Sequence, residues 1–491
     1  MEHFDLIVIG GGPSGYAGAM RALDFGKKVL LIEKKRIGGA GVYSGVLTSK
    51  TLWEQALKVA SIREVIPGFE AKFEDFSKIV DEAVFERKTQ MSVHLQLLQK
   101  LQNKLFYYEK GTAYIIDKNT VQLTKEDGST KNISAANILI ATGSSPRKPA
   151  NIQVDEKIIV TSDGIINFKD FPKSMVVLGA GVIGCEFATI FSAFGKTKVY
   201  LIDKADRILP FEDEDVAKVV TDNLEGQGAH VHHGASLKRM EVKDGKVEYE
   251  LEFKDGHHEV LQVDKALVSI GRAANVSSLG LENIGIKFND RGGIWNDDTQ
   301  TNISNIYVAG DVTTEVALVN VGEREARHAV VRMFGPLVKP LNYKNISTIM
   351  FLNPEVAAVG MSEQDLVSKG IPHKVVKLDY TTNARAIAMR KTKGFFKIIV
   401  TNDNAMRILG MRVVGEHASS AIQAVAYLIY TNQGIRELAD MMHPHPSIIE
   451  GVQECLRMLL NKSIYKPYIF TDRLKCYVTE NGVSTAVKSL E

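Results

Sequence analysis

Two glycine-rich turns in this chain have the spacing of phosphate-binding turns, and an acidic residue follows each of them. Each turn reads Gly-x-Gly-x-x-Gly directly after an apolar stretch, and the acid closes the next apolar stretch. The residues of the first set are Gly10, Gly12, Gly15 and Glu33. The residues of the second set are Gly179, Gly181, Gly184 and Asp203.

Each residue type in this pattern has a physical role in holding a dinucleotide. The first glycine makes a tight turn, the second lets the backbone approach a pyrophosphate, and the third allows the next helix to pack closely on the strand. The amides at the helix N-terminus stabilise the phosphate charge, and the acid accepts hydrogen bonds from ribose hydroxyls. One such turn could be structural only, but two complete sets indicate two dinucleotide sites.

The turns require strands before and after them. The apolar, β-rich stretches 4–9 and 29–32 predict the two strands around the first turn. The stretches 175–178 and 199–202 predict the corresponding strands around the second turn. Each unit is therefore a strand, a glycine turn, a helix, a second strand and a terminal acid.

Three further apolar strands end in a turn. Two of them, 138–143 and 267–271, end in glycine and complete the two units. The third, 306–311, ends in Asp311. Because ligands bind outside the carboxyl ends of strands in open α/β sheets, Asp311 is a candidate cofactor contact. The alternative for this residue is a structural helix N-cap.

Composition and charge are those of an ordinary globular protein of about three domains. The 491 residues are 45% hydrophobic and 24% charged, with a formal net charge of +2. This balance gives no sign of a nucleic-acid or membrane-surface binder, and no apolar run reaches the roughly 18 residues of a membrane span. The chain enters a strand at once, so we expect no cleavable signal peptide, and three cysteines argue against a disulfide framework. A cytoplasmic location is the resulting expectation.

Eight motifs follow one another in the order that a known family shows. They are GGGPSG, IGGAG…SGVLTSK, ATGSSPR, GAGVIGCE, IGRAAN, YVAGDV, NPEVAAVG and HPHPSIIE. Together they cover residues 4–462 and resemble the flavoprotein disulfide reductase family. That family of pyridine nucleotide-disulfide oxidoreductases includes dihydrolipoamide dehydrogenase, glutathione reductase, mercuric reductase and soluble pyridine nucleotide transhydrogenase. The phrase GAGVIGCEFATIF is most similar to the transhydrogenase branch.

The resemblance implies a glutathione-reductase-like α/β fold with two Rossmann-like dinucleotide-binding domains and a C-terminal α/β dimerisation domain. A discontinuous FAD-binding domain is expected from residues 1–150 and 280–345, which enclose an NAD(P)-binding domain at 151–279. The interface domain is expected at 346–470 and would form a homodimer. Residues 471–491 remain as a C-terminal tail to which no function is assigned.

The resemblance assigns FAD to the first glycine turn and NADH or NADPH, as the hydride donor, to the second. Asp311 would reach the ribityl chain, and the backbone of Leu318 and Val319 would lie near the pyrimidine edge of the flavin. Lys50 would lie beside the flavin N5 and pair with Glu186, where a cation stabilises electron density arriving on the ring. The alternative for this pair is two unconnected surface charges. The remaining glycines assigned to these sets are Gly143 for FAD and Gly271 for NAD(P).

The choice between the two nicotinamide dinucleotides stays open at the level of sequence. A carboxylate at Asp203 favours NADH because it repels a 2′-phosphate. Lys204 and Arg207 follow closely and could accommodate that phosphate, so NADPH remains possible.

The cysteine pair that the family uses is replaced in this chain. The family has two cysteines separated by four residues just before a Ser-Lys step, and here Gly41 and Val46 stand at those positions. Neither side chain can form a thiolate or a disulfide. We therefore expect the disulfide route to be closed and dihydrolipoamide dehydrogenase activity to be absent. The cysteines that the chain does have are Cys185, Cys455 and Cys476.

A histidine and a glutamate near the C-terminus match a second feature of the family. In the family, a histidine of the partner subunit faces the active site and a glutamate five residues on orients it; His445 and Glu450 have this spacing. A positioned imidazole can deliver a proton to an acceptor that is being reduced. The alternative is a structural interface histidine. Tyr43, beside the vacated cysteine positions, could offer a stacking platform for a flat acceptor.

Two further clusters are expected to be structural. The His230-x-His232-His233 cluster lacks a matching carboxylate or cysteine ligand set, so we expect no metal. The acidic run 212–215 is expected to lead a helix, where negative charge favours the helix dipole.

These observations favour an FAD-dependent NAD(P)H oxidoreductase that passes hydride to the flavin and then electrons to a small-molecule acceptor. The acceptor is not a disulfide, and a quinone or a dye is the first choice. An alternative is NAD(P) transhydrogenation. An alternative of another class is a catalytically silent FAD-binding scaffold.

Overall fold

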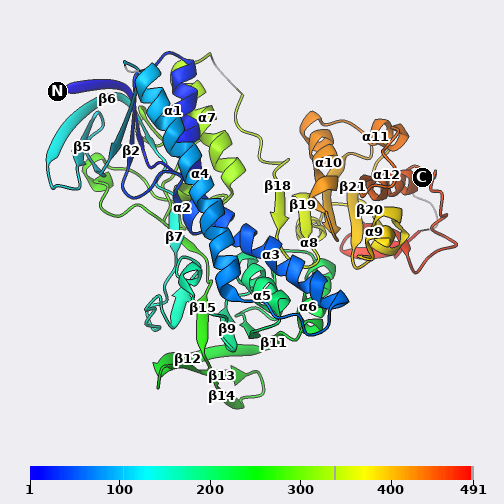
Figure 1. The fold of residues 1–491 in the computed structure, drawn as a ribbon. Coiled ribbons are helices and arrows are strands. Elements are labelled where there is room, and N and C mark those ends of the chain that lie inside the picture. Colours follow the sequence, from blue (N-terminus) through cyan, green and yellow to red (C-terminus); the bar gives the residue numbers. More distant parts are fainter. Residues whose placement is uncertain (103, 337–338, 488–491) are drawn as a thin grey trace. The chain divides into compact units, whose positions relative to one another are not determined.

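The computed structural model describes residues 1–102, 104–336 and 339–487, which form two compact units (Figure 1). Unit 1 comprises Met1–Gln55, Glu70–Phe171 and Leu267–Leu341. Unit 2 comprises Ala56–Phe69, Pro172–Ala266 and Asn342–Glu491. The first glycine turn lies in unit 1, whereas the second glycine turn and the C-terminal segment lie in unit 2. The three domain boundaries expected from the sequence stay a prediction.

Unit 1 is built on a seven-stranded sheet with the order β3-β2-β1-β6-β5-β4, and β17 pairs with the end of β6. Strands β3, β2, β1, β6 and β17 run parallel, as strands joined by helical crossovers do. The bounds are Glu2–Ile9 (β1), Val29–Glu33 (β2), Phe106–Lys110 (β3), Thr112–Asp117 (β4), Thr120–Thr124 (β5), Thr130–Ile140 (β6) and Ile306–Val308 (β17). The strands predicted around the first turn are thus present.

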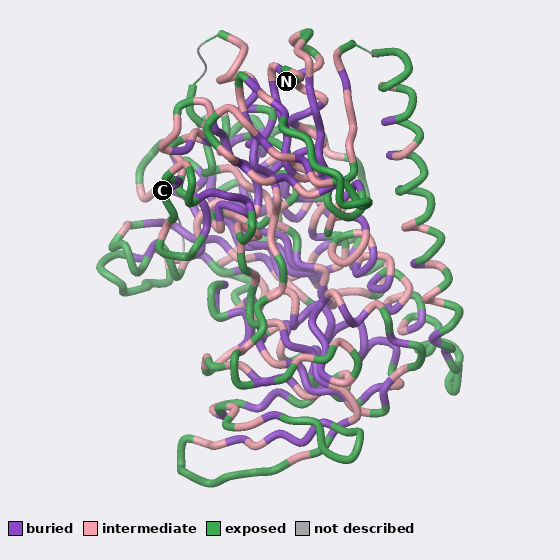
Figure 2. Tube along the Cα trace, turned by 90° about the vertical axis from the view of Figure 1, so that its left-hand side faces the viewer, coloured by how far each residue is buried: buried purple, intermediate pink, exposed green. Residues whose placement is uncertain are grey.

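Both faces of this sheet are buried, as its near-continuous apolar sequence indicates. Leu6 and Val8 belong to one apolar cluster, and Ile7 and Ile9 belong to another, because successive side chains of a strand point to opposite faces. Figure 2 shows the buried residues concentrated along the strands. The helices that contribute to the Leu6 cluster are α1 (Pro13–Asp24), α2 (Gly39–Tyr43), α4 (Phe73–Leu101) and α7 (Val319–Phe334).

Unit 2 contains the second dinucleotide-binding pattern. Strands β9 (Ser174–Leu178), β10 (Lys198–Ile202) and β11 (His230–His232) are parallel neighbours in the order β11-β10-β9. Helix α5 (Val182–Phe194) connects β9 to β10, and α6 (Glu214–Gly226) connects β10 to β11. This is the strand, turn, helix and strand sequence that the second glycine turn predicts. A small antiparallel sheet follows, formed by β12 (Ala235–Lys243), β13 (Lys246–Phe253) and β14 (His258–Val263).

The C-terminal part of unit 2 is a seven-stranded antiparallel sheet with the order β18-β19-β22-β21-β20-β23-β24. Helices α10, α11 and α12 cover one face and share a large apolar cluster with it. The strands are Ser347–Met350 (β18), Val356–Gly360 (β19), His373–Asp379 (β20), Phe395–Thr401 (β21), Ile408–Val414 (β22), Leu474–Glu480 (β23) and Val483–Ala486 (β24). The helices are Glu363–Ser368 (α8), Ala384–Met389 (α9), Ser419–Thr431 (α10), Arg436–Asp440 (α11) and Ile449–Leu459 (α12).

The C-terminal tail, to which the sequence assigned no function, extends this sheet. Strand β23 pairs antiparallel with β20, and β24 pairs with β23 at the outer edge. Residues 488–491 of the tail lie outside the described residues. Most of the tail is therefore a structural part of the C-terminal sheet.

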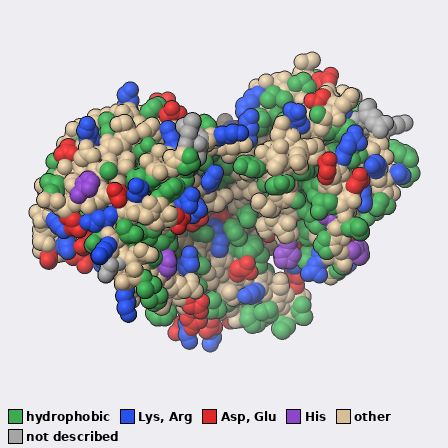
Figure 3. All heavy atoms as spheres, turned by 90° about the horizontal axis from the view of Figure 1, so that it is seen from above, with side chains coloured by type: hydrophobic (Ala, Val, Ile, Leu, Met, Phe, Trp, Pro, Cys, Tyr) green, Lys and Arg blue, Asp and Glu red, His purple; other side chains and the backbone are tan. Residues whose placement is uncertain are grey.

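The described residues include no membrane-spanning helix, and the face in view has no surface region of a single charge sign. Within the described ranges, no helix is both long enough and apolar enough to cross a membrane. Basic and acidic side chains are interspersed on the face shown in Figure 3. This mixture agrees with the small net charge of the chain.

A buried lysine joins the α6 region to the C-terminal sheet within unit 2. The Lys397 side chain is 1% exposed, and its Nζ lies 2.9 Å from Asp213 Oδ2, 3.0 Å from Asp215 Oδ1 and 3.0 Å from Glu363 Oε2. Nearby, Arg412 Nε donates to Glu212 Oε2 at 2.7 Å. The acidic run 212–215 does lead a helix, as predicted, because α6 begins at Glu214 with Asp213 as its N-cap. The structure adds ion pairs to the C-terminal sheet, which the sequence analysis did not foresee.

Replacing Lys397 should destabilise unit 2 strongly. Lys397→Ala leaves three carboxylates without their shared cation, and breaking a buried ion pair costs about 3–5 kcal/mol. We expect the urea midpoint of unfolding, followed by circular dichroism, to fall by a corresponding amount. Lys475→Ala, at an exposed position on β23, is the control and should change little. Equal midpoints for the two variants would contradict a structural role for the buried cluster.

Candidate active site

In the first unit, the acid at the end of β2 is tied to the glycine turn. Glu33 is 9% exposed, and its Oε2 accepts a hydrogen bond from Gly11 N at 2.7 Å. Its Oε1 accepts from Lys35 N at 2.6 Å. The carboxylate thereby fixes the middle of the turn between β1 and α1. Lone pairs that remain on the two oxygens can accept ribose hydroxyls, because a carboxylate has about four acceptor sites.

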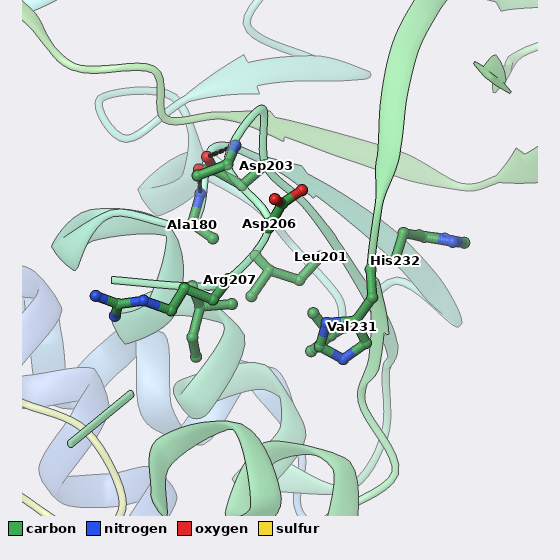
Figure 4. Close-up of a pocket in the computed structure, with 10 residues that line it drawn as sticks. Ala180, Leu201, Asp203, Asp206, Arg207, Val231 and His232 are labelled. Carbon is green, nitrogen blue, oxygen red and sulfur yellow. Dashed lines mark hydrogen bonds between the residues drawn. The ribbon is translucent and has the colours of Figure 1, made fainter. Parts of the chain in front are cut away.

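The second unit repeats this geometry in different residues. Asp203 Oδ2 accepts from Ala180 N at 2.5 Å, and Oδ1 accepts from Ala205 N at 2.8 Å (Figure 4). Ala180 is the middle residue of the second turn, as Gly11 is of the first. The two predicted acids therefore hold two glycine turns in the same way.

The turns leave space where a pyrophosphate must approach. A Cβ atom added at Gly12 or at Gly181 would meet nothing within 4 Å. A Cβ added at Gly15, in contrast, would lie 1.8 Å from Gly10 O, so that glycine allows the helix to approach the strand closely. Gly10 and Gly179 have φ values of 105° and 101°, which favour glycine. These residues fit FAD in the first unit and a nicotinamide dinucleotide in the second.

Asp311 lies in a polar network within unit 1. It follows β17 and begins a short 3₁₀ helix, Asp311–Thr313, without a side-chain capping hydrogen bond. Ser144 Oγ donates to Asp311 Oδ2 at 2.7 Å, and Arg272 Nε donates to Ser144 Oγ at 2.7 Å. One carboxylate oxygen is thus held by serine. The serine and the arginine were absent from the sequence-based site, although both belong to quoted motifs, ATGSSPR and IGRAAN.

The other residues assigned to the cofactors, Leu318, Val319 and Gly143 to FAD and Gly271 to NAD(P), occupy strand ends and a helix start. Leu318 precedes α7, and Val319 is its first residue, so their backbone stands at a helix N-terminus. Gly143 and Gly271 have φ values of 67° and 100° and follow β6 and β15 (Lys265–Val268). Positions that need positive φ explain why glycine stands there.

The segment that should carry the family cysteines is helical and tightly packed at its first position. Gly41 lies in α2, and a Cβ added there would be 2.8 Å from Pro13 Cγ. Val46 begins α3 (Val46–Val65) and is exposed. The Tyr43 ring packs 5.2 Å from the Arg36 guanidinium and joins the apolar cluster of the sheet. Burial raises the pKa of the Tyr43 hydroxyl, against the opposing charge of Arg36.

Lys50 and Glu186 belong to different units, so their pairing stays a prediction. Lys50 lies on α3 within unit 1 and is half-buried. Glu186 lies on α5 in unit 2, is 5% exposed, and accepts a hydrogen bond from Phe351 N at 3.1 Å.

His445 and Glu450 are in contact, as their spacing predicts. His445 Nδ1 lies 2.8 Å from Glu450 Oε1, and Ser447 N donates to Glu450 Oε2 at 2.8 Å. Burial raises the pKa of Glu450, but the hydrogen bonds from His445 and Ser447 outweigh it and hold that pKa below its usual value. An ionised Glu450 favours the tautomer with the proton on Nδ1 and leaves Nε2 to exchange protons. The His445 side chain is 70% exposed in the single chain.

A pocket in unit 2 lies directly beside the Asp203 carboxylate (Figure 4). The Arg207 side chain lines this pocket but extends away from Asp206, and its guanidinium bonds elsewhere. The sequence left Arg207 open as a 2′-phosphate ligand, whereas the structure shows its donors already engaged. The lining residues are Ala180, Leu201, Asp203, Ala205, Asp206, Arg207, Ile208, Val231, His232 and His233.

The histidines at this pocket are part of an aromatic group. His232 stacks on Tyr200 with ring centroids 5.8 Å apart and lies 3.5 Å from the Tyr249 hydroxyl. Burial and the neighbouring His230 and His233 lower the pKa of His232 to about 4, so this ring is neutral at physiological pH. Among the described residues, no group of histidine, cysteine or acidic side chains could hold a metal ion.

Two dinucleotide-binding units, with an antiparallel C-terminal sheet and a histidine–glutamate pair, define a flavin- and nicotinamide-dependent oxidoreductase. The chain belongs to the pyridine nucleotide-disulphide oxidoreductase family, whose model matches residues 4–326. The dimerisation domain of the same family matches residues 346–456. The predicted fold, the enzyme class and the use of FAD and NAD(P)H are confirmed by this membership.

Relatives of known sequence or structure cover nearly the whole chain. It is 32% identical over 471 residues to a dihydrolipoyl dehydrogenase of Chlamydia muridarum, covering 95% of this chain and 99% of the relative. It is 30% identical over 468 residues to a dihydrolipoyl dehydrogenase of Bacillus subtilis, covering 94% and 97%.

Solved structures of similar proteins have the same fold. LpdA from Mycobacterium tuberculosis superposes with a TM-score of 0.84 at 26% identity, covering 94% of this chain and 100% of LpdA. The HOCl-induced flavoprotein disulfide reductase RclA from Escherichia coli, solved as a Cu(II) complex, gives 0.82 at 26% identity, covering 93% and 99%.

Filling the open space at one turn should abolish binding at that turn alone. Gly181→Val should leave the fold and the bound FAD intact, because Gly181 has φ −75° and no close neighbour, yet block the nicotinamide pyrophosphate. We expect NAD⁺ affinity, measured by titration calorimetry, to fall by about tenfold or more. Gly226→Ala, at another glycine without close neighbours, is the control. Loss of FAD from Gly181→Val, or unchanged NAD⁺ affinity, would refute the assignment of the second turn.

Proposed function

We propose that this protein is an FAD-dependent NAD(P)H oxidoreductase whose electron acceptor is a quinone-type small molecule and not a disulfide. The proposal rests on the motif resemblance, by which Gly41 and Val46 would stand at the family's two cysteine positions. FAD, when bound, accepts hydride from the nicotinamide and gives up electrons to the second substrate. A disulfide substrate would need a thiol relay beside that group, and this segment offers none.

The three cysteines of the chain do not supply a substitute relay. Cys185, Cys455 and Cys476 are all buried and free. Burial raises the pKa of each thiol, to about 11 for Cys476 and well above the usual value for Cys185 and Cys455, so that the reactive thiolate is disfavoured. Cys185 Sγ also donates to Ala180 O at 3.3 Å, which is a structural contact.

The donor half of the reaction uses unit 2. The amides at the start of α5 and the open face of Gly181 bind the pyrophosphate, and Asp203 binds the adenosine ribose. NADH is the preferred donor, because the carboxylates of Asp203 and Asp206 flank the pocket while Arg207 is engaged elsewhere. A 2′-phosphate would meet negative charge there, and of the two cations that follow Asp203 only Lys204 would be left to compensate it.

The acceptor half uses Lys50 and His445. The Lys50 ammonium would stabilise negative charge on the ring system of FAD when it is reduced. His445 delivers a proton from Nε2 to a quinone oxygen, with Glu450 holding the ring through Nδ1. The Tyr43 ring packs against Arg36 and into the apolar cluster of the sheet. The small residues of the 41–46 segment, together with His445, therefore carry the acceptor site.

A homodimer completes this site, in keeping with the family's dimerisation domain. The C-terminal part of unit 2 exposes large apolar side chains that a partner subunit would cover. Tyr427 and Tyr430 on α10 are each 59% exposed, and Met442, next to the His445 loop, is fully exposed. Exposed apolar residues gathered in this way are typical of interfaces.

The test is an anaerobic titration of the purified flavoprotein, followed by flavin absorbance. NADH should bleach the flavin more readily than NADPH, and a benzoquinone should restore the absorbance. Lipoamide should not be turned over. Lipoamide turnover would overturn the proposal. Restoration by thio-NAD⁺ alone would identify a transhydrogenase, which the GAGVIGCE motif resembles, and absence of bleaching would leave an FAD-binding scaffold.

His445 should affect only the second half of the cycle. His445→Gln removes the proton donor, so quinone reduction should slow by about 100-fold. The rate of flavin bleaching by NADH should remain unchanged in stopped-flow measurements. His443→Gln is the matched control, since His443 Nε2 donates to Leu438 O and takes no part in the proposed reaction. If both variants slow equally, His445 is a structural residue.

A further inference from the structure

The loop that carries the nucleotide-binding acid is also the loop that meets the C-terminal sheet. It runs from Asp203, at the end of β10, to Asp213, at the start of α6. Its first half lines the pocket of Figure 4. Its second half includes Leu209, whose φ of 46° is unusual for a non-glycine residue and must be held by neighbouring contacts. Contacts at the second half therefore bear on the shape of the pocket.

Arg207 organises the middle of this loop. Its Nη1 donates to Leu209 O at 3.1 Å, and its Nη2 donates to Glu212 O at 2.6 Å and Pro210 O at 3.3 Å. The same Nη2 donates to Gln364 Oε1 at 2.6 Å. The guanidinium thus closes the loop on itself and joins it to a residue of α8.

Gln364 is the residue through which α8 meets this loop. Its Oε1 accepts from Arg207, and its Nε2 donates to Pro210 O at 3.3 Å. Its backbone N donates to Asp213 Oδ1 at 3.0 Å. Ser362 caps the same short helix by accepting from Asp365 N at 3.0 Å, which fixes the position of Gln364. Gln364 therefore contacts the middle of the loop through its side chain and the end of the loop through its backbone amide.

The loop is also tied to the glycine turn itself. Leu209 N donates to Ala180 O at 2.9 Å, while Ala180 N donates to Asp203. A displacement of Leu209 would therefore affect Ala180 and, through the Ala180 amide, Asp203. This connection runs from Gln364 through Arg207 and Leu209 to the amide that holds the ribose-binding carboxylate.

We propose that Gln364 is a positioning residue for the nicotinamide dinucleotide: by holding Arg207, it keeps the 203–213 loop in the conformation that binds the adenosine ribose. Gln364 touches neither the dinucleotide nor the flavin. Its effect therefore falls on the affinity for the dinucleotide and leaves the rate of hydride transfer from bound NADH unaltered. The proposal rests on the second glycine turn as the nicotinamide site and is independent of the electron acceptor.

The test compares dinucleotide binding with flavin reduction in the FAD-loaded protein. For Gln364→Ala, the Kd for NAD⁺ from titration calorimetry should rise about three- to tenfold, the range that corresponds to the net contribution of a typical intramolecular hydrogen bond. The limiting rate of anaerobic flavin reduction at saturating NADH should stay within twofold of the parent. Gln364→Glu retains an acceptor for Arg207 and should restore the Kd. Ser368→Ala, on the same helix and away from the loop, is the matched control.

The outcomes separate this proposal from its alternatives. An unchanged Kd in Gln364→Ala would overturn it. An equal rise in Ser368→Ala, or a fall in the limiting rate with unchanged Kd, would also overturn it, because either result indicates a general effect of the helix or of the active site. If Gln364→Ala fails to fold, Gln364→Glu and Arg207→Lys replace it in the test. A parental Kd for Gln364→Glu together with a raised Kd for Arg207→Lys supports the connection. A parental Kd for both variants rejects it. Failure of the parent protein to bind NAD⁺ would refute the nicotinamide site itself.

Discussion

The hydrogen bond between a strand-end carboxylate and the middle amide of a glycine turn is the constraint on which both cofactor sites depend. Glu33 holds Gly11, and Asp203 holds Ala180, with the same pair of oxygens used in the same way. A negative charge beside a phosphate site is unfavourable by itself. The backbone amides neutralise part of that charge and turn the remaining lone pairs outward, where ribose hydroxyls can donate to them. Both glycine turns are thereby kept open before any ligand binds.

Much of the fold could be predicted because its strands are short, apolar and interrupted by glycine. The stretches 4–9, 29–32, 175–178 and 199–202 became β1, β2, β9 and β10 with ends shifted by two residues at most. Backbone requirements such as a positive φ at Gly10 are written in the residue type itself. Spacing also sufficed for His445 and Glu450, since five residues around a turn bring the two side chains into contact.

Side-chain partners distant in sequence could not be predicted in this way. Arg207 reads as a free cation near the nucleotide acid, yet the fold gives it four carbonyl or amide acceptors. The acidic run 212–215 reads as a helix start, yet three of its carboxylates reach Lys397 or Arg412 on the C-terminal sheet. Three of the Arg207 acceptors lie within its own loop, but nothing local to either segment specifies Gln364, Lys397 or Arg412 as a partner. They follow from packing two layers together, and only the three-dimensional arrangement reveals them.

Some features of the chain depend on the backbone and others on particular side chains, and this difference bears on its chemistry. The donor half depends on glycines, helix termini and one acid, which are mostly backbone requirements. The proposed acceptor half depends on particular side chains, and the segment that resembles the family's cysteine segment has Gly41 and Val46. Gly41 is packed so closely on Pro13 that a side chain would have to displace it. Because function resides in such sites and not in the fold, the acceptor half is where a change of chemistry would arise, and the proposed quinone-type acceptor rests on these two positions.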